Sequence, residues 1–193
     1  MTSNSKKKLQ DKISKLEKEI WDKEKEVVLL KRELSKQNVS NYEFQTAEGT
    51  VTLSDLFNEK SDLILIHNMG KKCPYCTMWA DGFNGLLHYI TNRSAFVIVS
   101  PDNPVIQRVF AESRGWKFEM VSDKNGSFTT DMGYKFDDKK YMPGVSVFYK
   151  DETGKITRTC MDVFGPGDNY NSPWHLFRLL KDGINEWSPK FKY

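Results

Sequence analysis

The sequence predicts an α/β domain in which helices flank a central mixed β-sheet, with a long helix added at the N-terminus. Three patterns support this prediction. Residues 6–37 contain neither glycine nor proline and repeat apolar residues at helical spacing. Strand and helix patterns then alternate from residue 63 to about residue 115, which is typical of parallel βαβ units. Near the C-terminus, two alternating segments joined by residues 151–154 indicate an antiparallel hairpin.

The N-terminal helix is predicted from apolar residues at a mean spacing of 3.5. Seven of eight positions on this seam are apolar, and the series is Leu9, Ile13, Leu16, Ile20, Lys23, Val27, Leu30 and Leu34. Such a stripe is typical of a coiled coil, so one interpretation is a homodimer through this helix. The alternative is that its second half packs on the parent domain, because Val28 and Leu29 widen the apolar face. We expect residues 1–38 to form this helix and residues 39–193 to form the globular domain.

The globular domain is expected to begin with a hairpin, in which residues 42–45 and 50–53 alternate in polarity. Ser54 is then expected to cap a short helix that runs through Phe57. Pro104 and Gly115 give the usual bounds of a later helix, with proline early and glycine late. From residue 63, the expected order is strand, helix, strand and helix over residues 63–68, 76–90, 95–100 and 104–115.

The second half of the domain has a different pattern. A short strand is expected over residues 118–122, followed by a loop-rich segment to Lys140. The hairpin strands are residues 145–149 and 155–160, and Ser172 and Pro173 open a final helix that extends through Leu180. A parallel βαβ unit followed by an antiparallel ββα unit is the thioredoxin-type arrangement. We therefore predict a thioredoxin-like fold.

Two cysteines separated by two residues, Cys73 and Cys76, stand between the first buried strand and its helix. A helix N-terminus favours a thiolate, so Cys73 is the expected nucleophile. Cys76, one turn further, would resolve a mixed disulfide. Pro74 suits the first helical turn, and the lysines at 71 and 72 add positive charge nearby. The alternative is that both thiols are inert packing residues.

Composition excludes several classes of function. The chain has 193 residues, of which 38% are hydrophobic and 28% charged, and no apolar run approaches the ~20 residues of a membrane span. The charged start lacks the apolar core of a signal peptide, so we expect a cytoplasmic location. With three cysteines in a reducing compartment, a close pair is more readily redox-active or metal-binding than structural. The net charge of +3 gives no support for nucleic-acid or membrane partners, and no cofactor is expected.

Several further motifs follow one another along the chain. They are Lys23-Glu24-Lys25-Glu26, Leu30-Lys31-Arg32-Glu33-Leu34, Val51-Thr52-Leu53-Ser54-Asp55-Leu56-Phe57, His67-Asn68-Met69, Cys73-Pro74-Tyr75-Cys76-Thr77-Met78-Trp79-Ala80-Asp81, Pro143-Gly144-Val145-Ser146-Val147-Phe148-Tyr149 and Trp187-Ser188-Pro189-Lys190-Phe191-Lys192-Tyr193. On these motifs the chain resembles the DUF899 family, an uncharacterised branch of the thioredoxin-like superfamily. The resemblance implies a thioredoxin-like fold and leaves the substrate unknown. It also implies a cis Met142–Pro143 bond facing the dithiol, with the neighbouring backbone pairing to substrate.

His67 lies six residues before Cys73, where thioredoxins usually hold a buried carboxylate that handles protons for the resolving thiol. An imidazole at this place could do the same work near neutral pH, and the alternative is a satisfied core histidine. Trp79 is expected to be core or the wall of a pocket. The residues predicted to bind substrate are Met142, Pro143, Pro74, Tyr75 and Trp79.

We therefore predict a thiol–disulfide oxidoreductase that acts on an unidentified thiol or disulfide, in a protein or a small molecule. Cys73, Cys76 and His67 are its predicted catalytic residues. One alternative is a zinc- or copper-binding module built on the same cysteines, and another is a non-catalytic scaffold that binds a partner. Peroxiredoxins need a threonine three residues before their cysteine, and Gly70 stands there instead. Cys160 is expected to be a small buried hydrophobe.

Overall fold

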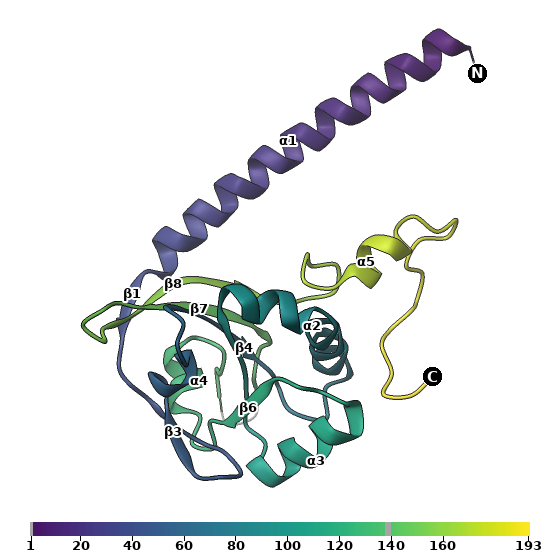
Figure 1. Ribbon diagram of the computed structural model, residues 1–193. Coiled ribbons are helices and arrows are strands. Elements are labelled where there is room, and N and C mark those ends of the chain that lie inside the picture. Colours follow the sequence, from purple (N-terminus) through teal and green to yellow (C-terminus); the bar gives the residue numbers. More distant parts are fainter. Residues whose placement is uncertain (1, 138–139) are drawn as a thin grey trace.

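The computed structural model describes residues 2–137 and 140–193. Within them, the strands form one eight-stranded sheet in the order β1-β8-β7-β4-β5-β6-β2-β3 (Figure 1). The strands are β1 (Gln37–Val39), β2 (Glu43–Gln45), β3 (Thr50–Thr52), β4 (Asp62–His67), β5 (Ala95–Ser100), β6 (Glu119–Ser122), β7 (Gly144–Lys150) and β8 (Ile156–Val163). The neighbours β4–β5 and β5–β6 are parallel, and the other pairs are antiparallel. This mixed sheet confirms the predicted α/β fold class.

Helices lie on both faces of the sheet. They are α1 (Ser3–Ser35), the 3₁₀ helix η1 (Asp55–Phe57), α2 (Pro74–Arg93), α3 (Pro104–Arg114), α4 (Ser127–Asp131) and α5 (Ser172–Phe177). Alternate residues of a strand point to opposite faces, so the sheet carries two apolar cores. On one face α2 packs over Ile66 and Ile98. On the other face α4 and η1 pack over Leu63 and Val97.

Two helices begin at or within two residues of their predicted starts. Pro74 occupies the first turn of α2, which begins two residues earlier than expected because Cys73 serves as its N-cap. The Asn103 side chain caps α3 by accepting a hydrogen bond from the Val105 N–H, and Gly115 ends that helix in a left-handed conformation with φ 68°. These ends fix the two helices that follow the parallel strands β4 and β5.

Some elements differ from the expectations. The Ser54 side chain makes no capping bond, and the Asp55 carboxylate instead accepts hydrogen bonds from Thr52. The strand β1 was not anticipated, and it pairs with β8 from Gln37, within the segment expected to be helical. A short helix, α4, interrupts the segment expected to be a loop, and α5 ends at Phe177 instead of Leu180.

The long helix α1 is confirmed over Ser3–Ser35, and it projects from the rest of the chain (Figure 1). Contact with the domain is made by its C-terminal half, where Lys31 pairs with Asp162 at 2.5 Å. At the end of the helix, the buried Arg158 donates hydrogen bonds to the carbonyl oxygens of Ser35 (3.4 Å) and Met132 (2.9 Å). The apolar seam of α1 stays 44–83% exposed. In the described part of the chain, no helix combines the length and apolar character needed to cross a lipid bilayer.

Candidate functional site

The two cysteines of the CPYC segment meet at the start of α2. Cys73 is the N-cap residue, and its Sγ accepts a hydrogen bond from the Cys76 backbone N–H at 3.0 Å. Cys73 is 9% exposed and Cys76 is 2% exposed, and both are free thiols. The more accessible sulfur therefore sits where the helix presents unpaired N–H groups. This is the arrangement predicted for a nucleophile and its buried partner.

The environment separates the two thiols in acidity. Hydrogen bonding from the Cys76 thiol and from the Cys76 and Tyr75 backbone lowers the pKa of Cys73 to about 7, although burial opposes the shift. The pKa of Cys76 is raised, because its thiol donates to the Cys73 sulfur and lies buried beside the developing negative charge. At neutral pH, Cys73 is therefore partly a thiolate, while Cys76 keeps its proton.

The loop before Cys73 is held by side chains from two strand ends. The Asn68 side chain accepts a hydrogen bond from the Gly70 N–H at 2.7 Å, and Asp102 accepts one from the Lys71 N–H at 2.6 Å. Gly70 has φ +98°, and a Cβ added there would lie 2.9 Å from Asp102 Oδ2. A β-branched threonine is strained in this conformation and also clashes. The position that peroxiredoxins fill with threonine thus requires glycine here.

Sequence reasoning missed the role of Asp102. A signal was available, because Asp102 follows β5 and Asn68 follows β4, and the two strands are parallel neighbours. The carboxyl ends of parallel strands meet at one edge of a sheet, so polar residues after both strands are expected to lie together.

The structure does not bring His67 to the dithiol. Its Nε2 lies 2.9 Å from Ser146 Oγ, and its ring stacks on Tyr134 with 3.8 Å between ring centroids. Alternation along β4 places His67 on the same face as Leu63, whereas Cys76 packs on the opposite face. Burial, and secondarily the positive charge of Arg158, hold the pKa of His67 well below 6.5. His67 is therefore a neutral core histidine, but it is not fully satisfied as the alternative interpretation expects, because its buried Nδ1 has no hydrogen-bond partner among the described residues.

Met142 and Pro143 lie at the same end of the sheet as the dithiol loop. In the pairing of β4 with β7, His67 is opposite Gly144, so Pro143 stands next to the start of that loop. The Pro143 carbonyl accepts a hydrogen bond from the Phe164 N–H at 2.9 Å. The described residues contain no cis peptide bond, so the implied cis Met142–Pro143 bond is wrong. The trans form is the usual preference of an X–Pro bond, and the chain here is held by ordinary backbone pairing.

Aromatic side chains stand beside the cysteines on α2. The Tyr75 ring is half-buried and lies 6.2 Å from both Trp79 and Trp174, between ring centroids. Trp79 and Trp174 are themselves buried, and the Trp79 indole N–H donates to Asp168 at 3.4 Å. Trp79 is therefore part of the core, while Pro74 and Tyr75 keep exposed surface next to Cys73.

The metal-binding alternative gains no third ligand from the geometry. Among residues 2–137 and 140–193, no group of three His, Cys, Asp or Glu side chains is placed to hold a metal ion. The His88 ring lies 3.6 Å from that of Tyr89 between centroids, tilted by 41°, and His175 Nε2 lies 2.9 Å from the backbone carbonyl oxygen of Asp168. Cys160 lies half-buried on β8, less buried than expected.

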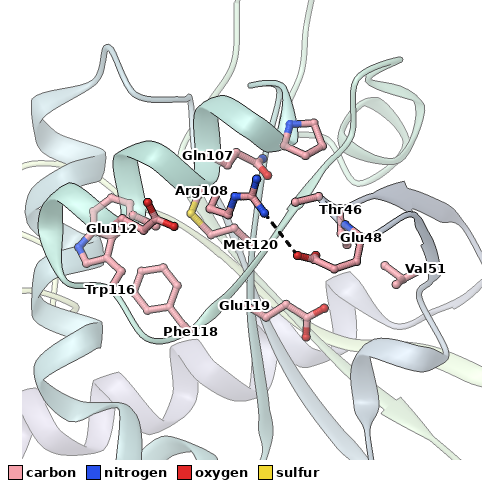
Figure 2. Close-up of a pocket in the computed structure, with 13 residues that line it drawn as sticks. Thr46, Glu48, Val51, Gln107, Arg108, Glu112, Trp116, Phe118, Glu119 and Met120 are labelled. Atoms are coloured by element: carbon pink, nitrogen blue, oxygen red, sulfur yellow. Dashed lines mark hydrogen bonds and ion pairs between the residues drawn. The ribbon is translucent and has the colours of Figure 1, made fainter.

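A separate pocket of about 480 Å³ lies between α3, β6 and the β2–β3 hairpin (Figure 2). Its wall includes the Trp116 and Phe118 rings, and its rim carries Arg108, which pairs with Glu48 at 3.7 Å. Burial and the charge of Glu48 raise the pKa of Glu119. Neither Cys73 nor Cys76 lines this pocket, so it is distinct from the dithiol.

Comparison with known sequences decides the family. The profile of the bacterial protein of unknown function DUF899 matches residues 3–192. The chain belongs to the DUF899 family. No curated protein sequence matches this DUF899 chain.

Solved structures similar to the DUF899 chain include several peroxiredoxins. Peroxidoxin BcpB from Mycobacterium tuberculosis is 24% identical, with a TM-score of 0.56 over 72% of this chain and 89% of that one. Reduced Prx3 from Vibrio vulnificus is 16% identical, with a TM-score of 0.59 over 72% and 93%. A peroxiredoxin-like protein from Aquifex aeolicus is 18% identical, with a TM-score of 0.52 over 67% and 75%. At these identities the likeness establishes the thioredoxin-type fold alone.

Proposed function

We propose that this DUF899 protein is a thiol–disulfide oxidoreductase in which Cys73 attacks and Cys76 resolves. The observation that carries the proposal is the position of the Cys73 sulfur, which serves as the N-cap of α2. There the pKa of Cys73 is lowered to about 7, while the buried Cys76 thiol beside it keeps its proton. Thiol–disulfide exchange requires such a pair, in which the more accessible thiol is acidic and its buried partner stays protonated.

The reaction begins with the reduced protein and a disulfide substrate. The Cys73 thiolate attacks one sulfur of the substrate, the substrate S–S bond breaks, and its second sulfur leaves as a thiolate that takes up a proton. Cys76 then loses its proton to solvent and attacks Cys73, which releases the first substrate sulfur and leaves a Cys73–Cys76 disulfide. Two electrons pass from the protein to the substrate. His67 has no place in this scheme, because it packs on the opposite face of the sheet.

Exposed surface next to Cys73 would receive the substrate. Pro74 and Tyr75 flank the sulfur, and Met142 and Pro143 stand at the same end of the sheet. The substrate is a thiol or disulfide carried by a protein or by a small molecule. A cytoplasmic location stays a prediction, which fractionation of cells that produce the protein would test.

A redox titration of metal-free protein, read by mass after alkylation, tests the proposal. We expect one two-electron transition of the Cys73–Cys76 pair, at a potential within about −270 to −120 mV, the range of known dithiol oxidoreductases. Cys160→Ser is the matched control and should leave the transition unchanged. Cys76→Ser should trap mixed disulfides that Cys73→Ser does not, and equal trapping by both variants would reject these roles.

Two other outcomes would redirect the assignment. If the pair never forms a disulfide and purified protein carries zinc or copper, the metal-binding function replaces the enzyme. If neither disulfide nor metal is found, the protein is a scaffold that acts through its surface. Rapid oxidation by hydrogen peroxide alone would instead indicate peroxide reduction by a mechanism without the threonine.

A further inference from the structure

We propose that α1 pairs with α1 of a second copy of this chain as a parallel two-stranded coiled coil. This inference is independent of the dithiol chemistry and gives the expected homodimer a geometry. The seam of α1 follows the a and d positions of a heptad repeat. The a positions hold Ile13, Ile20, Val27 and Leu34, and the d positions hold Leu9, Leu16, Lys23 and Leu30. β-Branched residues at a with leucine at d favour two parallel strands, and six of these eight positions follow that preference.

The described chain leaves this seam uncovered. Its apolar members are 44–83% exposed, and the N-terminal half of α1 stands clear of the sheet (Figure 1). An amphipathic helix gains most of its stability by packing its apolar face, so a stripe of this length requires a partner. Residues 2–137 and 140–193 do not supply one. Where α1 runs nearest the domain, a groove of about 620 Å³ separates Ile20 and Val27 from Val163 and Tyr170. A second helix laid along the seam would enter this groove and cover the exposed Val163 side chain.

Charges beside the seam favour a parallel pair in register. In such a pair, a residue at g meets the residue five positions later, at e, in the partner. Lys12 would meet Glu17 of the partner subunit, and Glu26 would meet Lys31 of the partner subunit. Both pairs join opposite charges. Lys31 already binds Asp162 of its own chain, so the second pair would extend an existing ion pair.

Another of these interhelical pairs joins like charges, and it flanks Lys23, the only polar residue of the seam. Glu19 would meet Glu24 of the partner subunit, at the level where the two Lys23 side chains enter the interface. Two lysines alone would repel each other, and so would the glutamates. Together they form a layer of opposite charges, in which Lys23 has carboxylates on both sides. The polar layer therefore specifies the register and the parallel orientation, at some cost in affinity.

The oligomeric state of the full chain tests the pairing. We expect light scattering to give twice the 22.4 kDa of one chain, and Ile20→Glu to halve that mass. Leu29→Glu is the matched control, because Leu29 is 62% exposed but lies off the seam at position c. Lys23→Leu should lower the dissociation constant at least tenfold, which no folding defect can imitate. A full chain that is monomeric at millimolar concentration, or equal effects of Ile20→Glu and Leu29→Glu, would overturn the proposal.

Orientation is tested by a single cysteine at the seam. In a chain with all three native cysteines replaced by serine, Leu9→Cys should form a covalent dimer under mild oxidation, since identical d residues face each other in a parallel pair. Lys15→Cys, at the outward position c, is the control and should stay monomeric on a non-reducing gel. A dimer by light scattering without a cross-link at position 9 would mean an antiparallel pair and would reject the orientation.

Discussion

The helices α1 and α2 both begin with a side-chain N-cap, but the surroundings of the two caps differ. At α1 the Thr2 hydroxyl accepts a hydrogen bond from the Ser5 N–H at 3.3 Å, and at α2 the Cys73 sulfur accepts one from Cys76 at 3.0 Å. The first cap is exposed and stabilises only its own turn. The second is buried beside another thiol, below a loop held by Asn68 and Asp102. An N-cap therefore becomes a reactive group only where the surroundings also fix its protonation.

The loop that positions the sulfur cap offers the largest change in stability. Gly70→Ala should destabilise the fold by about 1–3 kcal/mol through backbone strain at φ +98°, and more through contact with Asp102. Chemical denaturation measures the loss. Gly133→Ala is the control, since Gly133 also has positive φ (+82°) but an added Cβ would meet nothing within 4 Å. If both variants lose the same stability, the contact with Asp102 does not matter.

The thiol donor of α2 is the next feature to remove. Cys76→Ala should raise the pKa of Cys73 above about 7, because the S–H group that stabilises the thiolate is gone. A rise of one unit would reduce the thiolate fraction at pH 7 about fivefold. The pH dependence of the alkylation rate measures it. Cys76→Ser keeps an O–H donor and should show a smaller rise. Identical profiles for the alanine and serine variants would contradict a role for the donor.

The buried imidazole of β4 predicts a smaller, pH-dependent effect. The pKa of His67 in the folded chain is lower than its ordinary value of 6.5. Below pH 6.5, His67 is therefore protonated in the unfolded chain while it stays neutral in the folded chain. Above pH 6.5, His67 should have no effect on the free energy of unfolding. Below pH 6.5, the free energy of unfolding should decrease by up to about 1.4 kcal/mol per pH unit. Thermal melts of wild type and His67→Asn from pH 7.5 to 5.5 give this difference. Parallel curves would mean that His67 does not titrate on unfolding.

Removing the exposed cap should have the smallest effect. Thr2→Ala deletes the bond to Ser5 at a solvent-exposed terminus, so helix α1 loses at most about 1 kcal/mol locally. The melting temperature of the domain should not change, because that cap shares no packing with the sheet. A shift in the main thermal transition would show that the start of α1 is coupled to the domain.

The sequence predicts most reliably the helices whose ends are marked by residues with strong local backbone preferences. Proline at 74, proline at 104 and glycine at 115 mark helix ends by local geometry alone, and the structure follows them. The strand β1 could not be found in this way. Its residues, Gln37–Val39, show no apolar alternation, and it exists because β8 offers an edge for pairing. Tertiary pairing overrides weak local preference.

The candidate site was also predicted only in part, because some of its features depend on tertiary structure. The cysteine pair and its place on α2 follow from spacing, whereas the role of His67 depended on which face of β4 carries α2. Alternation placed His67 with Leu63 and Leu65, but a strand by itself does not disclose which of its faces a later helix will cover. The hydrogen bond from the Lys71 N–H to Asp102 likewise joins segments about thirty residues apart in the chain.

The guanidinium of Arg158 gives α1 a fixed base. By bonding the Ser35 carbonyl it helps to hold the C-terminal half of α1 against the domain, and the 33 residues of this helix make an arm of about 50 Å. An arm held at one end magnifies small rotations, so a tilt of about 10° at Ser35 would sweep the tip through roughly 9 Å. A small movement of the sheet near β8 would thus produce a large displacement of Leu9, at the opposite end of α1.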